Sequence, residues 1–197
     1  MKLTVFGAAG RTGRQVLAQA AARGHEITGF VRDAGRFEAP ARVRVVEGDA
    51  RDPLTVVEAV RGADAVISVL ALRSSEDEPQ YSEATRTIAE AGAQLKVARI
   101  VVTANNDAFG DDEVTGEFAA HAREHRRNRA TLQASSLAWT IGAAPLVTDD
   151  PATGAYAAVV DGKAPGGRLP AADFATFTLD ALERDAWIGH LVGVSSP

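Results

Sequence analysis

Short apolar runs alternate with longer amphipathic stretches through residues 1–142 of the chain. Runs rich in Val, Ile and Leu predict strands, and stretches with apolar residues three or four positions apart predict helices. We expect strands at 3–6, 26–31, 42–47, 63–70, 99–103 and 137–142, and helices at 11–23, 53–60, 79–96 and 114–133. Strands that alternate with helices form right-handed βαβ units. The pattern therefore predicts an α/β fold with a doubly wound parallel sheet and helices on both faces.

The rhythm changes after residue 145, where Gly, Pro and Asp become frequent. This part offers a strand candidate at 155–160, a helix at 170–183 and a last strand at 191–194. We expect residues 1–197 to form one domain, because chains of this length commonly do. Residues 145–170 are expected to form a small irregular lobe over the carboxyl-terminal edge of the sheet, where a substrate would bind.

Composition excludes several classes of function. The formal net charge of −5 argues against a nucleic-acid partner, which needs a basic face. The lack of cysteine excludes disulfides and thiolate catalysis. No apolar run approaches the roughly 20 residues of a membrane span, and the first residues do not resemble a signal peptide. We therefore expect no membrane partner and a cytoplasmic location.

A glycine-rich turn follows the first predicted strand, in the sequence Gly7-Ala8-Ala9-Gly10-Arg11-Thr12-Gly13. In dinucleotide sites of the Rossmann type, such glycines allow a tight turn, a close approach to the pyrophosphate and close packing of helix on strand. The exposed amides at the helix start then receive the phosphates. The alternative is a tight turn without a ligand. The predicted cofactor residues here are Gly7, Ala9, Gly10, Arg11, Thr12 and Gly13.

The second strand ends in Arg32, with Arg36 close behind. NAD-specific sites usually carry an acidic residue at this position, which bonds the ribose 2′-hydroxyl. A guanidinium instead suits the extra 2′-phosphate. We therefore expect NADP(H) as cofactor, with NAD(H) as the less favoured choice. Asp33 complicates this reading, because a carboxylate that points inward would repel the phosphate.

Further cofactor residues are expected where the third, fourth and fifth strands end. Asp49 can accept a hydrogen bond from the adenine amino group, although a plain Asx turn is the alternative. Backbone beyond the fourth strand usually runs beside the cofactor. The candidates are Asp49, Ala50, Ala71, Leu72, Arg73 and Thr103.

These residues resemble the atypical short-chain dehydrogenase/reductase superfamily, in its NmrA-like NAD(P)-binding branch. The similarity extends over nearly the whole chain and is greatest to the NADPH-dependent flavin reductases, which include biliverdin-IXβ reductases. It implies cofactor roles for Gly7, Gly10, Thr12, Gly13, Arg32, Arg36 and Asp49, and places residues 102–106 beside the nicotinamide. The motifs that carry it are Phe6 to Gly13, Val31-Arg32-Asp33, Gly48-Asp49, Asp64 to Ile67, Thr153-Gly154-Ala155-Tyr156, Asp161-Gly162 and Asp173-Phe174.

The chain departs from the typical members in its chemistry. Their Tyr-x-x-x-Lys pair is absent, because Tyr81 and Tyr156 are followed four residues later by Thr85 and Val160. Asn105 stands near a position where similar proteins have a serine. We assign Asn105 and Asn106 as candidate catalytic residues that can donate a hydrogen bond to a carbonyl or to the nicotinamide amide; a polar turn is the alternative.

Other polar side chains are expected to be structural. His121 and His125 share a helix face, but no third ligand is suggested, so we expect no metal site. They are interpreted as solvated or cofactor-edge histidines, with a proton-donor role as the alternative. The basic run from Arg123 to Arg129 is interpreted as a solvated face with Glu117 and Glu124 as partners, and a patch that binds a partner or a phosphate is the alternative. The aromatic candidates for core or pocket wall are Phe109, Trp139 and Tyr156.

These observations favour an NADPH-dependent oxidoreductase that transfers a hydride to a flavin, quinone, tetrapyrrole or similar flat acceptor. Such a reaction asks little of the protein beyond positioning the two rings. The alternatives are a non-catalytic NADP(H)-sensing regulator of the NmrA-like type, or an epimerase or isomerase of specialised metabolism. The resemblance implies a monomer or a weak homodimer.

Overall fold

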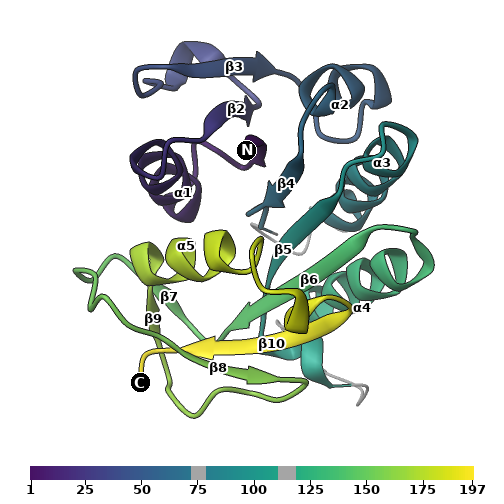
Figure 1. Cartoon of the computed structure of the whole chain (residues 1–197). Helices are drawn as coiled ribbons and strands as arrows, with labels where there is room; N and C mark the ends of the chain where they lie inside the picture. Colours follow the sequence, from purple (N-terminus) through teal and green to yellow (C-terminus); the bar gives the residue numbers. More distant parts are fainter. Residues whose placement is uncertain (72–78, 111–118) are drawn as a thin grey trace.

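A single large sheet organises the computed structural model, which describes residues 1–71, 79–110 and 119–197 (Figure 1). The sheet has eight strands in the order β3-β2-β1-β4-β5-β6-β10-β8. The first six of these are parallel, and their order is that of two βαβαβ halves joined back to back. The strands are β1 (Lys2–Phe6), β2 (Glu26–Val31), β3 (Val43–Glu47), β4 (Ala65–Ser68), β5 (Arg99–Asn105), β6 (Ala138–Ala144), β8 (Ala157–Val160) and β10 (His190–Ser195).

Helices cover both faces of the sheet (Figure 1). One face carries α1 (Arg11–Ala22) and α5 (Ala171–Asp180), and the other carries α2 (Pro53–Val60), α3 (Gln80–Gln94) and α4 (Ala119–Ala134). Each face has its own apolar core, because parallel strands covered on both sides are apolar on both sides. Val5, Leu17 and Phe177 belong to the first core, and Phe6 and Ile88 to the second.

The structure confirms the predicted fold class and the order of its elements. The ends of most elements differ by one to three residues, for reasons that are local. The fourth strand, for example, spans only Ala65–Ser68, although the amides of Asp64 and Val69 on either side of it still donate to carbonyl oxygens of β1. Of the helix predicted at 114–133, residues 119–133 are helical, and residues 114–118 lie outside the described part.

The expectation of a lobe at residues 145–170 needs correction. β8, which lies within this range, is the antiparallel edge strand of the main sheet and pairs with β10 from Val160 opposite Val192. The remaining strands of this region, β7 (Val147–Thr148) and β9 (Leu169–Pro170), form a separate two-stranded sheet. The sequence pattern missed this, because pairing with a distant strand leaves no periodic mark on so short a segment.

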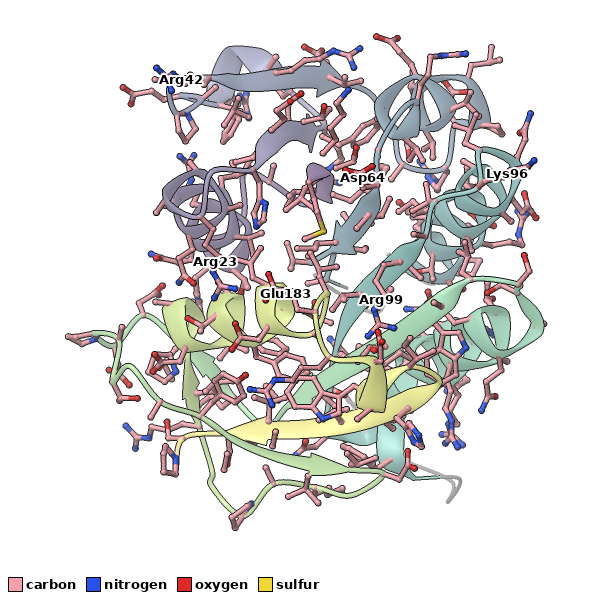
Figure 2. The ribbon with its side chains drawn as sticks, viewed as in Figure 1. Arg23, Arg42, Asp64, Lys96, Arg99 and Glu183 are labelled. Atoms are coloured by element: carbon pink, nitrogen blue, oxygen red, sulfur yellow. The ribbon has the colours of Figure 1, made fainter. Side chains whose placement is uncertain are left out.

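The C-terminal elements are tied to the N-terminal half by polar contacts. Arg23 at the end of α1 forms a 2.8 Å ion pair with Asp180 on α5. Arg99 lies between β5 and the end of α5 (Figure 2), where its guanidinium donates to the carbonyl oxygens of Ala181 and Arg184. Because orphan carbonyls at a helix end need donors, this buried arginine stabilises the end of α5.

No helix in the described ranges is both long enough and apolar enough to cross a lipid bilayer. The cytoplasmic location stays a prediction.

Candidate cofactor-binding site

The glycine-rich turn joins β1 to α1 at the point where the strand order reverses. Gly7 has a φ of +78°, and a Cβ there would lie 2.8 Å from the carbonyl oxygen of Val69, beyond β4. At Gly13, a Cβ would lie 2.1 Å from the carbonyl oxygen of Gly7. Gly7 is therefore needed for the backbone conformation and Gly13 for the close packing of α1 on the turn.

The N-terminus of α1 starts at Gly10, so the first turn has no side-chain cap. The amide of Gly10 donates to Gly7, which closes the turn. The next amides, at Arg11, Thr12 and Gly13, belong to the first helical turn, whose donors have no partner inside the helix. A helix start of this kind favours a phosphate.

Arg11 reaches away from this turn. Its guanidinium donates to the carbonyl oxygen of Val147 and forms a 3.0 Å ion pair with Asp149. The side chain thus links the first turn of α1 to the segment that begins with β7. Its predicted cofactor role stays a prediction, and it requires the side chain to leave this contact.

An open cavity of about 530 Å³ extends from the glycine turn along the carboxyl ends of β1, β2 and β4. Its size is typical of small-molecule sites, and its position is the switch-point crevice where doubly wound sheets bind ligands. The structure brings together here Gly7, Ala9, Gly10, Arg32, Arg36, Asp49, Ala50 and Ala71 of the predicted cofactor residues. Phe30, Val31, Asp33, Arg51, Val69, Leu70, Gln80, Tyr81 and Ala84 complete its lining.

Some predicted cofactor residues do not line this cavity. Thr12 and Gly13 lie in the first turn of α1, where Thr12 is half-buried and Gly13 is buried. Thr103 is buried between strands, and its hydroxyl donates to the carbonyl oxygen of Ser68 at 3.4 Å. Leu72 and Arg73 lie outside the described residues.

The far end of the cavity is charged. Arg36 forms an exposed 3.2 Å ion pair with Asp33, three residues earlier. The Asp33 carboxylate, which complicated the prediction of NADP(H), is therefore paired with a cation. Arg32 is exposed at the same end and forms no salt bridge among the described residues. Arg32 is therefore a cation whose charge is available to a ligand.

Asp49 is engaged by a neighbour that the sequence reasoning missed. Arg51 donates to it through the backbone amide, at 2.9 Å to Oδ1, and through Nε and Nη2 of the side chain. These hydrogen bonds, chiefly those from the side chain, lower the pKa of the Asp49 carboxyl below its usual range. The amide contact is the Asx turn that the sequence left open as an alternative. An aspartate followed two residues later by arginine was the available signal.

The polar residues at the end of β5 are tied into a local turn. Asn105 caps the short helix η3 (Asn106–Phe109): its Oδ1 accepts from the amide of Asp107, and its Nδ2 donates to the Asp107 carboxylate, both at 2.9 Å. Asn106 is different, because its Oδ1 is buried and has no hydrogen-bond partner among the described residues. Neither asparagine lines the cavity, and their catalytic roles stay a prediction.

Tyr81 and Tyr156 are both committed to structural hydrogen bonds. The Tyr81 hydroxyl is buried and donates to the carbonyl oxygen of Thr103 at 2.7 Å. The Tyr156 hydroxyl donates to Asp180 at 2.7 Å. The pKa of both phenols is raised, and burial is the main cause at each. The hydrogen bond to Asp180 raises the pKa of Tyr156 further. Neither tyrosine is prepared to act as an acid or base near neutral pH.

His125 is not solvated, which corrects one expectation. It is buried on α4, packs edge-on against Tyr81 and accepts from the Asn105 amide through Nε2 at 3.4 Å. Burial lowers its pKa to about 4, so the ring is neutral at physiological pH. A buried neutral ring does not serve as a proton donor at that pH; its contact supports the backbone at the end of β5.

The basic run of α4 is only partly a solvated face. Arg127 pairs with Glu124 at 2.7 Å as expected, but the Glu124 side chain is fully buried. It also accepts from the amide and hydroxyl of Ser82 in the first turn of α3. A carboxylate at a helix N-terminus is favourable, so Glu124 fastens α3 to α4. Glu117, its predicted companion, lies outside the described residues.

The Thr153 to Tyr156 motif has a structural explanation. Asp173, buried in the first turn of α5, accepts from the amide and hydroxyl of Thr153, both at 2.8 Å, and from the amide of Gly154 at 3.1 Å. Two of the aromatic expectations are confirmed, since Trp139 is buried and Tyr156 packs edge-on against Phe177. Phe109 packs against the second core as a partly buried residue.

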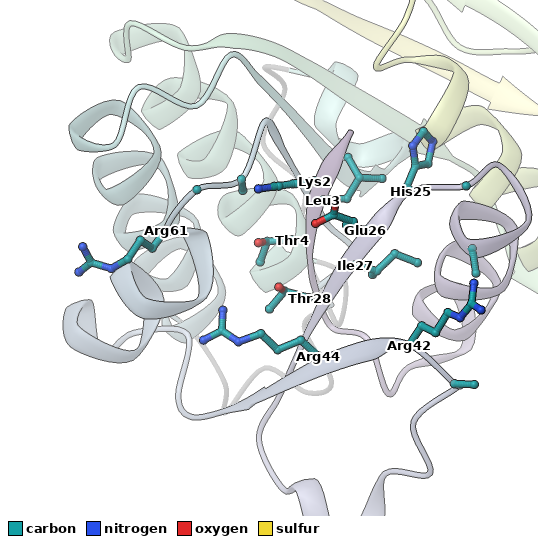
Figure 3. Close-up of a pocket in the computed structure, with 15 residues that line it drawn as sticks. Lys2, Leu3, Thr4, His25, Glu26, Ile27, Thr28, Arg42, Arg44 and Arg61 are labelled. Carbon is teal, nitrogen blue, oxygen red and sulfur yellow. The ribbon is translucent and has the colours of Figure 1, made fainter.

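A second cavity of about 510 Å³ lies at the opposite, amino-terminal edge of β1 to β3 (Figure 3). None of the predicted site residues lines it. Arg42 and Arg61 extend in different directions around it, and Arg44 is paired with Glu58 at 3.1 Å. With its cations spread apart, this cavity lacks the convergent groups of the first one.

Comparisons with known proteins identify the family of this chain. The profile of the NAD(P)H-binding family matches residues 7–185. YwnB of Bacillus subtilis, itself uncharacterised, is 29% identical over 203 residues, which cover 93% of this chain and 92% of that protein. The isoflavone reductase homolog IRL of Zea mays is 36% identical over 102 residues, which cover 46% of this chain and 32% of that protein.

Solved structures share the fold across the whole chain. A protein of Streptococcus pneumoniae TIGR4, named as a candidate NADH-flavin reductase, has a TM-score of 0.85 at 21% identity and covers 100% of both chains. A short-chain dehydrogenase/reductase of Veillonella parvula, solved with NADP, has a TM-score of 0.83 at 20% identity and covers 100% of this chain and 94% of that one. The resemblance to atypical short-chain dehydrogenases/reductases is confirmed, and the chain belongs to the NAD(P)H-binding family.

Proposed function

We propose that this protein is an NADPH-dependent oxidoreductase that reduces a flat acceptor such as a flavin, a quinone or a tetrapyrrole. The observation that carries the proposal is the joint position of the glycine cradle and Arg32 in one cavity. The turn takes this close-packed shape only because Gly7 and Gly13 carry no Cβ, which would lie 2.8 Å and 2.1 Å from backbone oxygen atoms. The residues present therefore fit a dinucleotide.

The charges of the cavity support NADP(H) over NAD(H). Each of the two aspartates, Asp33 and Asp49, is already paired with its own arginine. Arg32 is the third arginine of the cavity and remains available. A 2′-phosphate at the ribose would bind to it through charge-assisted hydrogen bonds, whereas a bare 2′-hydroxyl would leave this cation without an anion.

The other end of the site supports a flat acceptor. NADPH, when bound, supplies the hydride. The protein's part is to hold the end of β5 in place, through the Tyr81 hydroxyl at Thr103 and the His125 ring at Asn105. Neither tyrosine offers a proton, so a carbonyl-to-alcohol reduction lacks its usual acid. A flavin or quinone suits such a site, because its proton can come from solvent.

The names of similar proteins point the same way. The Streptococcus pneumoniae protein is named for NADH and a flavin, and the Veillonella parvula protein was solved with NADP. A 3-diazoavenalumate denitrifying reductase of Streptomyces is 37% identical over 100 residues, which cover 48% of this chain and 32% of that protein. All three of these proteins are named as reductases or dehydrogenases/reductases.

The test is oxidation of NADPH, followed at 340 nm, with FMN, FAD, menadione and biliverdin as separate acceptors. We expect turnover with at least one acceptor, and a higher KM for NADH than for NADPH. The control is the Arg86→Ala variant, since Arg86 is exposed on α3 and pairs only with Glu90 among the described residues. Binding of NADPH without turnover on any acceptor would contradict the proposal.

A non-catalytic NADP(H) sensor is the second candidate. Asn105 favours this candidate, because its side-chain amide is already hydrogen-bonded to Asp107. Of the two candidate catalytic asparagines, only Asn106 is then left to contact an acceptor. A sensor must bind NADPH and NADP⁺ with different affinities, because a ligand shifts only an equilibrium that it distinguishes. Calorimetry with both forms separates the candidates: equal affinities remove the sensor, and unequal affinities without turnover support it.

A further inference from the structure

We propose that this protein does not recognise the adenine amino group of its cofactor, and that Arg51 instead holds the purine ring by its face. The proposal rests on the proposed function, since it concerns the adenosine end of the same cavity. Arg51 then determines the specificity for the base, and the Asp49 carboxylate does not accept the hydrogen bond from the adenine amino group that the sequence led us to expect.

Arg51 is bonded to both oxygens of the Asp49 carboxylate. A carboxylate offers about four lone-pair sites. Oδ1 accepts from the amide and from Nε of Arg51, and Oδ2 accepts from Nε and from Nη2 of the same residue. Three N–H groups of one neighbour thus make all four contacts, with the Nε–H shared between Oδ1 and Oδ2, so both oxygens are already bonded to Arg51.

Arg51 and the adenine amino group would compete for the Asp49 carboxylate. A guanidinium on a carboxylate forms charge-assisted bonds, which are roughly twice as strong as neutral ones. The adenine amino group is a neutral donor, so it does not displace Arg51. The lowered pKa of Asp49 agrees with a carboxylate that stays ionised and bonded to the arginine.

Hydrogen bonds and close packing hold the turn that carries Asp49 and Arg51. Asp52 caps α2 by accepting from the amide of Leu54 at 3.1 Å, and its own amide donates to the carbonyl oxygen of Asp49 at 2.9 Å. A Cβ on Gly48 would lie 2.8 Å from Thr55, so the turn packs closely on α2. Arg51 is thus fixed by its partner and by its turn.

Arg51 contributes part of the cavity wall. Its guanidinium is planar, lines the cavity and is held by Asp49, while 41% of the side chain remains exposed. A planar cation stacks on the face of an aromatic ring. Stacking depends on the planar purine ring and little on the group at C6. Adenine and hypoxanthine should therefore stack equally well on Arg51.

The test compares NADPH with its 6-deamino analogue, nicotinamide hypoxanthine dinucleotide phosphate, by calorimetry at equal salt. We expect the unmodified protein to bind both with Kd values within about two-fold. In Arg51→Ala, both should bind about two- to five-fold more weakly, because the stacking is lost. The freed Asp49 should then favour NADPH over the analogue by about three- to ten-fold.

The result expected for Arg51→Ala is a gain of discrimination, which misfolding cannot produce. Arg61→Ala is the matched control, since Arg61 is exposed and lines the other cavity. Strong preference of the unmodified protein for NADPH would overturn the inference and leave the proposed function standing. Unchanged affinities in Arg51→Ala would overturn the stacking role. Failure of both nucleotides to bind at millimolar concentration would instead contradict the proposed function.

Discussion

Gly13 packs so closely on Gly7 that a Cβ at position 13 would lie 2.1 Å from the Gly7 carbonyl oxygen. The obstacle is backbone on both sides, so no side chain can move aside. The same contact sets the distance between α1 and the turn, and so fixes where the first amides of α1 point. Packing and the phosphate site thus depend on one pair of residues.

We therefore expect Gly13→Ala to lose NADPH binding and to lower the stability by more than about 2 kcal/mol, the range of overpacked sites. Gly24→Ala is the control, because Gly24 has a φ of +78° but nothing within 4 Å of an added Cβ. It should cost about 1 kcal/mol through backbone strain alone and leave the Kd unchanged. Chemical denaturation and calorimetry on the two variants check this; equal Kd values would refute it.

Arg32→Ala should weaken NADPH binding about 10- to 100-fold, the effect of losing hydrogen bonds to a charged group. NADH binding should change little, because NADH has no 2′-phosphate. The Kd values of both nucleotides for Arg32→Ala and for Arg86→Ala give the comparison. If NADH and NADPH lose affinity equally, Arg32 does not contact the 2′-phosphate.

The two asparagines at the end of β5 should respond differently to alanine. Asn105→Ala removes the cap of η3 and should lower stability by about 1 kcal/mol. Asn106→Ala should leave stability nearly unchanged but reduce kcat about 10-fold, because its buried Oδ1 is the atom left for a ligand. Thermal unfolding and single-turnover rates separate the effects, and an unchanged rate in Asn106→Ala would remove it from the site.

The stability of the protein should fall as the solution is acidified below pH 6.5. The pKa of His125 is about 4 in the folded chain and 6.5 without burial, so between these values the unfolded chain binds a proton that the folded chain does not. Stability is complete above pH 6.5 and is lost as the pH falls toward 4. At about 1.4 kcal/mol per pKa unit, the loss between pH 7 and pH 5 is about 2 kcal/mol.

His125→Gln should remove most of this slope, because glutamine does not titrate. His25→Gln is the control. Burial also lowers the pKa of His25, but this side chain is only partly buried. Urea unfolding at pH 5, 6 and 7 provides the free energies. A slope that persists in His125→Gln would assign the acid sensitivity to other groups.

The sequence determined the order of the strands and helices, because hydrophobic periodicity is a local record of which faces are buried. It also determined the glycine turn, because three closely spaced glycines after a strand indicate a backbone with no room for Cβ atoms. Gly7 and Gly13 are the positions where such an atom would clash. The position of Arg32 at the end of β2 follows from the same reading.

Only the tertiary structure decided which polar groups are already satisfied. Arg11 is held by residues 136 and 138 positions away, Glu124 is buried against Ser82, and His125 supports the backbone of Asn105. Even the short-range pair of Asp49 and Arg51 needed the fixed turn before α2 to bring its charges together. Periodicity records burial, whereas a hydrogen-bond partner depends on where separate elements meet in space, and a linear pattern does not contain that distance.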